Sequence, residues 1–77
     1  MKEFAEIIEK KIKEFYNGDR IYIKIQAITS DKLLIQFEIN NDFVEFDFDY
    51  DIGLSLDENI FILKYEIDGN ITNYYKI

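Results

Sequence analysis

The first sixteen residues alternate apolar and charged positions with the period of an α-helix. The apolar positions recur every three or four residues and so share one helical face: Phe4, Ala5, Ile8, Ile12 and Phe15, with Ile7 and Tyr16 at its margin. Glutamates lie toward the start of this segment and lysines toward its end, as the helix dipole favours. Gly18 follows, and glycine readily takes the left-handed conformation that ends helices. The pattern predicts a helix over residues 2–16.

Beyond Gly18 the period of the pattern changes to two, which predicts strands. Apolar and polar residues alternate in five runs, at about 20–28, 32–39, 43–51, 59–67 and 71–77. Matching the apolar faces sets the pairing, because a slip of one residue would turn a strand inside out. The match requires three-residue loops at 29–31 and 68–70 and a turn at 40–41, and it places Ile35 opposite Phe46.

These elements predict an α+β domain in which an N-terminal helix packs on one face of a five-stranded antiparallel meander sheet. The chain has 77 residues, which is room for one domain. Hydrophobic residues make up 48% of the chain, too many for a disordered segment. We therefore expect residues 1–77 to form a single folded domain.

The composition argues against several kinds of chemistry. The chain has no cysteine and no histidine, and so lacks thiolate ligands and the usual general base. Carboxylates on a flat strand face have nothing that separates their pKa values into an acid and a base. We expect no enzyme activity, no metal and no cofactor. The longest aliphatic and aromatic run, residues 60–63, is far too short to cross a membrane, so we expect a cytoplasmic protein.

The net charge of −7 is unevenly distributed. Residues 1–32 hold seven basic and six acidic side chains, whereas residues 33–77 hold ten acidic side chains and two lysines. A negative field of this kind repels nucleic acids and anionic membranes and attracts basic proteins. The partner that the charge predicts is therefore a basic protein surface.

Four carboxylates alternate along the predicted strand 43–51, which should place them in a row on one face: Glu45, Asp47, Asp49 and Asp51. Alternate residues of a strand lie about 6.6–6.8 Å apart, which is similar to the spacing of successive phosphates along a nucleic-acid strand. The predicted pairing places Gln36 opposite Glu45, Leu34 opposite Asp47 and Lys32 opposite Asp49. The row is thus poorly neutralised. It is either a solvated strand face or a surface that binds a basic partner.

Residues 47–58 also resemble an EF-hand calcium loop, with acids at the first, third and fifth places and Glu58 at the twelfth. Gly53 stands at the seventh place, however, whereas the motif needs glycine at the sixth. The flanking segments have the pattern of strands, whereas the motif needs helices. The strand interpretation is favoured over a cation-binding loop.

Several apolar residues should point away from the face that the helix covers: Tyr22, Ile28, Leu34, Phe43, Ile60, Ile62 and Tyr74. They either form a shallow second core with residues 52–58 or make a protein interface. This second reading gives the alternative function, a non-catalytic homo-oligomeric or adaptor domain that uses the apolar outer face of its sheet.

In its small size, its acidity and its row of carboxylates, the chain resembles phage-encoded inhibitors that imitate nucleic acid, such as anti-CRISPR and anti-restriction proteins. The resemblance is one of size and charge and involves no sequence motif. It implies an inhibitor that occupies a basic nucleic-acid-binding channel of a nuclease complex. The partner-binding residues that it implies are Glu45, Asp47, Asp49, Asp51, Asp42, Asp57 and Glu58, with Phe43 and Leu34 beside them.

Overall fold

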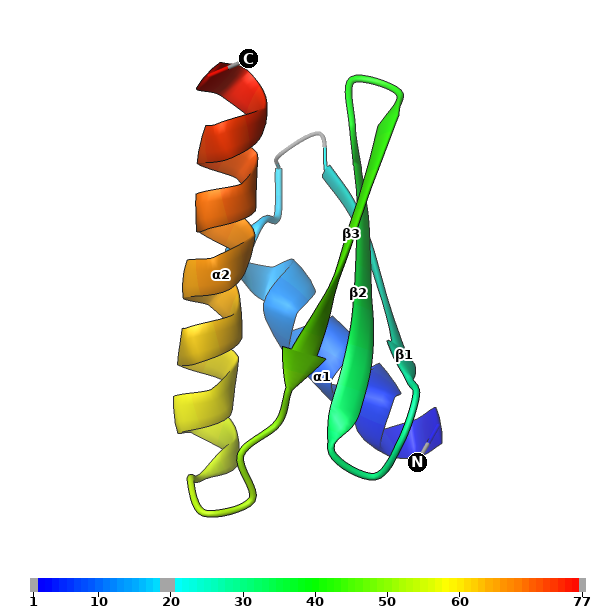
Figure 1. The fold of residues 1–77 in the computed structure, drawn as a ribbon, viewed down its shortest axis with the longest axis vertical. Coiled ribbons are helices and arrows are strands. Elements are labelled where there is room, and N and C mark those ends of the chain that lie inside the picture. The colour runs from blue at the N-terminus through cyan, green and yellow to red at the C-terminus, as the bar shows by residue number, and fades with distance from the viewer. Residues whose placement is uncertain (1, 19–20, 77) are drawn as a thin grey trace.

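The computed structural model describes residues 2–18 and 21–76. Their elements follow in the order α1 (Lys2–Phe15), β1 (Ile21–Ala27), β2 (Lys32–Ile39), β3 (Asp42–Asp49) and α2 (Leu56–Lys76). The strands form a three-stranded antiparallel sheet in the order β1-β2-β3. Figure 1 shows α2 running alongside the sheet next to β3, while α1 crosses the sheet diagonally. The fold is α+β.

The prediction of a five-stranded meander is wrong, because residues 59–67 and most of 71–77 belong to the single helix α2. The predicted loop at 68–70 lies inside that helix. The residues that α2 turns toward the sheet recur at helical spacing: Ile60, Leu63, Ile67, Ile71 and Tyr74. The misleading alternation arose because Phe61 and Tyr65, on the exposed side of α2, are apolar as well. Residues 20 and 77, at the ends of two predicted strands, lie outside the described residues.

The start of α2 is marked by a reciprocal pair of hydrogen bonds known as a capping box. The backbone N–H of Glu58 donates to Ser55 Oγ, and the backbone N–H of Ser55 donates to Glu58 Oε1, both at 3.1 Å. These bonds satisfy two donors at the point where a helix has no internal partner for them. The same Ser-x-x-Glu spacing is visible in the sequence and could have identified this helix.

The predicted pairing of the first three strands is confirmed. Ile35 lies opposite Phe46, and the three-residue loop at 29–31 is closed by a bond from the Ile28 N–H to the Lys32 carbonyl, at 2.8 Å. Asn40 and Asn41 have φ angles of 51° and 70°, as a two-residue hairpin turn of the favoured type requires. The registers therefore follow from side-chain alternation and turn length.

Both helices pack on the same face of the sheet. The buried core combines residues of all five elements: Ala5, Ile8, Ile12, Tyr16, Ile23, Ile25, Leu33, Ile35, Phe37, Ile39, Phe48, Ile60, Leu63 and Ile67. At the end of α1 the burial of two residues is the reverse of the prediction, which placed Phe15 on the apolar face and Tyr16 at its margin. Tyr16 is buried, whereas Phe15 is 46% exposed. The Tyr16 hydroxyl donates to Asp68 Oδ1 at 2.6 Å and so ties α1 to α2.

Asn59 fastens the loop between β3 and α2 to the body of the protein. Its side chain is only 2% exposed. Its Oδ1 accepts from the backbone N–H of Asp51 at 2.8 Å, and its Nδ2 donates to the carbonyls of Asp51 and Ser55, each at 2.9 Å. One buried amide thus satisfies three backbone groups, and the direction in which the chain leaves β3 depends on it.

Replacement of this amide should destabilise the protein markedly. We expect Asn59→Ala to lower the free energy of unfolding by roughly 1–3 kcal/mol, because buried backbone groups lose their partners. Asn70→Ala is the matched control, since Asn70 also lies on α2 but makes only an exposed bond to the Glu66 carbonyl. Urea denaturation of both variants measures the difference, and equal effects would contradict the role given to Asn59.

Candidate functional site

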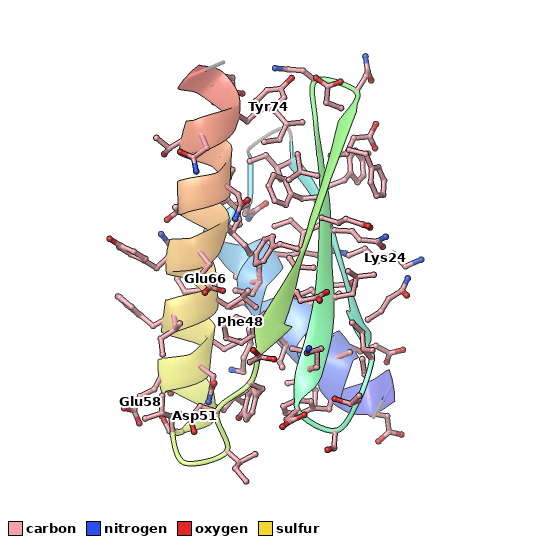
Figure 2. The ribbon with its side chains drawn as sticks, in the orientation of Figure 1. Lys24, Phe48, Asp51, Glu58, Glu66 and Tyr74 are labelled. Carbon is pink, nitrogen blue, oxygen red and sulfur yellow. The ribbon has the colours of Figure 1, made fainter. Side chains whose placement is uncertain are left out.

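The face of the sheet opposite the helices is covered by no other described element. The side chains that alternate onto this face come from all three strands: Tyr22, Lys24 and Gln26 from β1, Lys32, Leu34, Gln36 and Glu38 from β2, and Phe43, Glu45, Asp47 and Asp49 from β3. Figure 2 shows Lys24 projecting from the side of the sheet away from α2. We call this surface the open face.

The β3 carboxylates (Glu45, Asp47 and Asp49) are all exposed on the open face, at the edge of the sheet. Their cross-strand neighbours are the predicted ones, Gln36, Leu34 and Lys32 in that order. Gln36 Nε2 donates to Glu45 Oε2 at 3.1 Å. The two ion pairs among the described residues, Lys13–Glu9 and Lys64–Asp68, do not include a β3 carboxylate. Like charges thus stand side by side with little neutralisation.

Asp51 does not continue this row, because β3 ends at Asp49. Its Oδ1 accepts from the backbone N–H of Gly53 at 2.8 Å, which holds the turn before α2. Glu58 is likewise engaged in the cap of α2, and Figure 2 shows Asp51 and Glu58 together at that end of the molecule. Asp57 is exposed in the first turn of α2. The structure therefore gathers these three acids around the helix start and away from the open face.

Asp42 lies on the helix side of the sheet. It pairs with Ile39 across the hairpin, and its Oδ2 accepts from the Tyr74 hydroxyl of α2 at 2.6 Å. This hydrogen bond is the main reason why the pKa of Tyr74 is raised above its ordinary value, since it holds the phenol proton. This bond thus joins the end of α2, where Figure 2 labels Tyr74, to the β2–β3 hairpin.

Glu66 extends the acidic surface around the edge of the sheet from β3 to α2. Partial burial raises its pKa above the ordinary glutamate value, and the nearby negative charge of Asp49 raises it further. Glu66 is not among the site residues that the sequence predicts, because residues 59–67 have the alternation of a strand. A helical reading would have placed Glu66 on the flank of α2.

Phe43 and Leu34, the two apolar residues predicted beside the acids, are both on the open face. Phe43 is 67% exposed and Leu34 is half-buried. Phe43 also lines a shallow hollow of about 370 Å³, to which none of the β3 carboxylates contributes. The other residues that line it are Glu9, Lys13, Tyr22, Ile23, Lys24, Gln36, Phe37 and Glu38. This end of the open face offers aromatic side chains beside acidic ones.

The seven apolar residues predicted for one outer surface do not share a face. Ile60 is buried in the core and Tyr74 packs against it. Ile62 is exposed on α2, whereas Tyr22 and Phe43 are exposed on the sheet. The division follows from α2 being a helix, since the predicted faces of residues 59–77 assumed strands.

The resemblance of residues 47–58 to a calcium loop is not accompanied by a cluster of ligands. Asp47 and Asp49 are in β3, Asp51 is in the following turn and Glu58 caps α2. Within the part of the chain that the structure describes, no three His, Cys, Asp or Glu side chains come close enough together to hold a metal ion.

No helix among the described residues is long and apolar enough to span a membrane. Comparison with known proteins gave no match to a family model, to a curated protein or to a solved structure. The case for a function therefore depends on the geometry and charge of the open face.

The partial burial of Glu66, together with the nearby charge of Asp49, has a consequence for stability that depends on pH. Because the folded-state pKa of Glu66 is raised, the folded protein favours the protonated carboxyl. The stability that this gives is complete below the unfolded pKa of about 4.3 and is lost as the pH rises through the folded pKa. We expect Glu66→Gln to raise the midpoint of thermal unfolding at neutral pH, with the gain disappearing below about pH 4.

Glu6→Gln is the control for this pH experiment, because Glu6 is exposed on α1. It should change the midpoint little at either pH. A lower midpoint for Glu66→Gln at neutral pH, or the same gain for both variants, would show that burial and the charge of Asp49 do not measurably disfavour the ionised form of Glu66.

Proposed function

We propose that this protein is a non-catalytic inhibitor that presents the β3 carboxylates to a basic, nucleic-acid-binding surface of a nuclease complex. The observation that supports this most directly is the position of Glu45, Asp47 and Asp49. They lie side by side on an uncovered sheet face, and no described lysine or arginine forms an ion pair with them. A basic surface could supply the missing counter-charges.

The geometry of a strand suits such a role. Alternate side chains lie about 6.6–6.8 Å apart on a rigid backbone, so the charges hold a fixed spacing before the partner arrives. A preorganised row loses less conformational entropy on binding than three carboxylates on a loop would lose. The hydrogen bonds of β3 to β2 along the whole hairpin provide this rigidity.

Glu38 and the aromatic side chains beside it offer an anchoring point beyond the Glu45 end of the row. Tyr22, Glu38 and Phe43 stand next to one another across the three strands, so a carboxylate is flanked by two exposed aromatic side chains. A guanidinium group could pair with such a carboxylate and lie against an aromatic ring. The proposed contact therefore combines charge along β3 with an arginine anchor near the hairpin turn.

The proposed mechanism is steric and electrostatic. The acidic half of the chain accelerates the encounter with a basic channel, and the bound protein then occupies the space that DNA or RNA needs. Because the attraction is between opposite charges, the affinity should fall steeply as salt is added. We propose that the protein acts in the cytoplasm.

The test is a double charge reversal, Asp47→Lys with Asp49→Lys. Immobilised wild-type protein should capture a basic nucleic-acid-handling protein from a native lysate at roughly 0.15 M salt and release it at high salt. The captured protein should also be displaced by DNA or RNA. The reversed variant should capture none of it, since the charges that attract the partner have changed sign. Mass spectrometry identifies and quantifies the captured protein.

The matched control is Glu3→Lys with Glu6→Lys, which reverses two exposed acids of α1. Each reversal adds two positive charges, so both double variants move the net charge from −7 to about −3. The control should capture the partner as well as wild type does. If the Asp47→Lys, Asp49→Lys variant captures the same proteins in the same amounts, or if both variants lose them equally, the proposed role of β3 is wrong.

A further inference from the structure

β1 lies at one edge of the sheet, so one side of its backbone has no neighbouring strand among the described residues. In an antiparallel strand, the N–H and C=O groups of one residue point to the same side, and this side alternates along the chain. The N–H of Ile25 points away from β2, because it donates to Glu9 Oε1 of α1 at 2.7 Å. By the same alternation, the backbone groups of Ile21, Ile23 and Ala27 point outward. We call this side of the strand the β1 edge.

The composition of β1 makes this edge prone to pairing with another strand. Ile21–Ala27 contains three isoleucines and a tyrosine, which favour strands, and has no acid, glycine or proline. Its one charged residue is Lys24. An exposed edge with high β-propensity and little charge is a template for strand addition. The other edge strand differs, because β3 carries carboxylates at alternate positions and Figure 1 shows α2 beside it.

Glu9 lies across the β1 edge, between the helix and the strand. Shallow hollows follow one another along this edge, and each is lined by residues of both α1 and β1. Glu9 lines two of them, of about 370 and 440 Å³, so its side chain interrupts the groove. The side chain is 24% exposed, and both of its oxygens are engaged. Oε1 accepts from the Ile25 N–H, and Oε2 accepts from Lys13 Nζ at 3.2 Å.

We propose that Glu9 blocks strand addition at the β1 edge, and that without it two copies of the protein pair antiparallel through β1. The carboxylate oxygen occupies the position at Ile25 that the carbonyl oxygen of an added strand needs. In a pair with its two-fold axis at Ile23, the N–H of Ile25 would donate to the Ile21 carbonyl of the second copy. Glu9 and the second copy therefore compete for the same donor.

The charges around the β1 edge are compatible with a second copy as the strand that enters. α1 and β1 together carry five lysines and four glutamates, so this side of the protein is not acidic although the net charge is −7. The axis at Ile23 sets Tyr22 against Lys24 of the second copy, so an aromatic ring and no like charge faces the lysine. Because β2 separates β3 from this edge, the two rows of β3 carboxylates would lie at the outer edges of the combined sheet.

Sedimentation velocity from low to high micromolar concentrations tests the block. Glu9→Ala should dimerise at concentrations at least tenfold below any at which wild type associates, because the donor of Ile25 is released. Glu6→Ala is the matched control and should stay monomeric like wild type. It removes the same charge from α1, and Glu6 is an exposed residue that lines the same groove.

Two conservative variants separate the reach of the Glu9 side chain from its charge. Glu9→Asp keeps the charge but is one methylene too short to reach Ile25, so it should dimerise as Glu9→Ala does. Glu9→Gln loses the charge but keeps an acceptor oxygen at the same length, so it should stay monomeric. If Glu9→Ala does not fold, the comparison of Glu9→Asp with Glu9→Gln decides the question.

Amide hydrogen exchange locates the contact. In dilute wild type, the N–H of Ile25 should exchange about tenfold more slowly than that of Ile23, although both point outward. Glu9→Asp should abolish this difference in the monomer. As that variant dimerises, exchange at Ile23 should slow, because the paired strand now accepts from it.

The proposal is overturned if Glu9→Ala and Glu9→Asp stay as monomeric as Glu6→Ala, or if wild type or Glu9→Gln dimerises as tightly as they do. A dimer that leaves exchange at Ile23 unchanged is joined through another surface and overturns it as well. All these measurements use the protein alone, so their results are independent of the binding of a basic partner.

Discussion

The structure depends on the burial of one face of a three-stranded sheet under two helices. The aliphatic side chains of β1 and β2 turn toward α1 and α2, and the core residues of both helices reach the same cluster. A sheet of this size has just enough apolar residues for one core. The polar side chains that alternate with them are thereby placed on the opposite face, where no described element covers them.

Apolar and acidic residues alternate along β3, so the acidic ones form a row on the open face. Val44, Phe46 and Phe48 face the core, and this fixes the positions of Glu45, Asp47 and Asp49 on the other side. A change of register that hid the carboxylates would expose the aromatic residues, so the fold itself maintains the row. The bonds from Asn59 to Asp51, just after β3, and from Tyr74 to Asp42 then hold the two ends of α2 against the same hairpin.

The sequence was sufficient to predict α1, the three-stranded part of the sheet and the register of both hairpins, because each depends on local periodicity and turn length. It misled on α2 because that segment is rich in β-branched and aromatic residues and contains Asp68-Gly69-Asn70, which is typical of a turn. The apolar residues of this segment fit the period of a strand and the period of a helix equally well. Packing decided between them, since a helix brings Ile60, Leu63 and Ile67 together under the sheet.

The same error limited the prediction of the candidate site. The positions of the three β3 carboxylates and Phe43 on the open face can be predicted from the alternation alone. The positions of Asp51, Asp57 and Glu58 are instead set by the turn and the cap that begin α2. The proximity of Glu66 to Asp49 depends on the path of α2 past β3 and has no local signal in the sequence. Charge counts predict that a chain is acidic, but only the packing of its elements decides which acids gather.

We propose that the open face attracts a basic ligand because of its geometry and not merely because the chain is acidic. Titration of isotope-labelled protein with an arginine-rich peptide, followed by amide chemical shifts, tests this most directly. The account predicts that the largest shifts occur at Glu45, Asp47 and Asp49, while Glu3 and Glu6 on α1 change little. Shifts spread evenly over all acidic residues, or centred on α1, would contradict it.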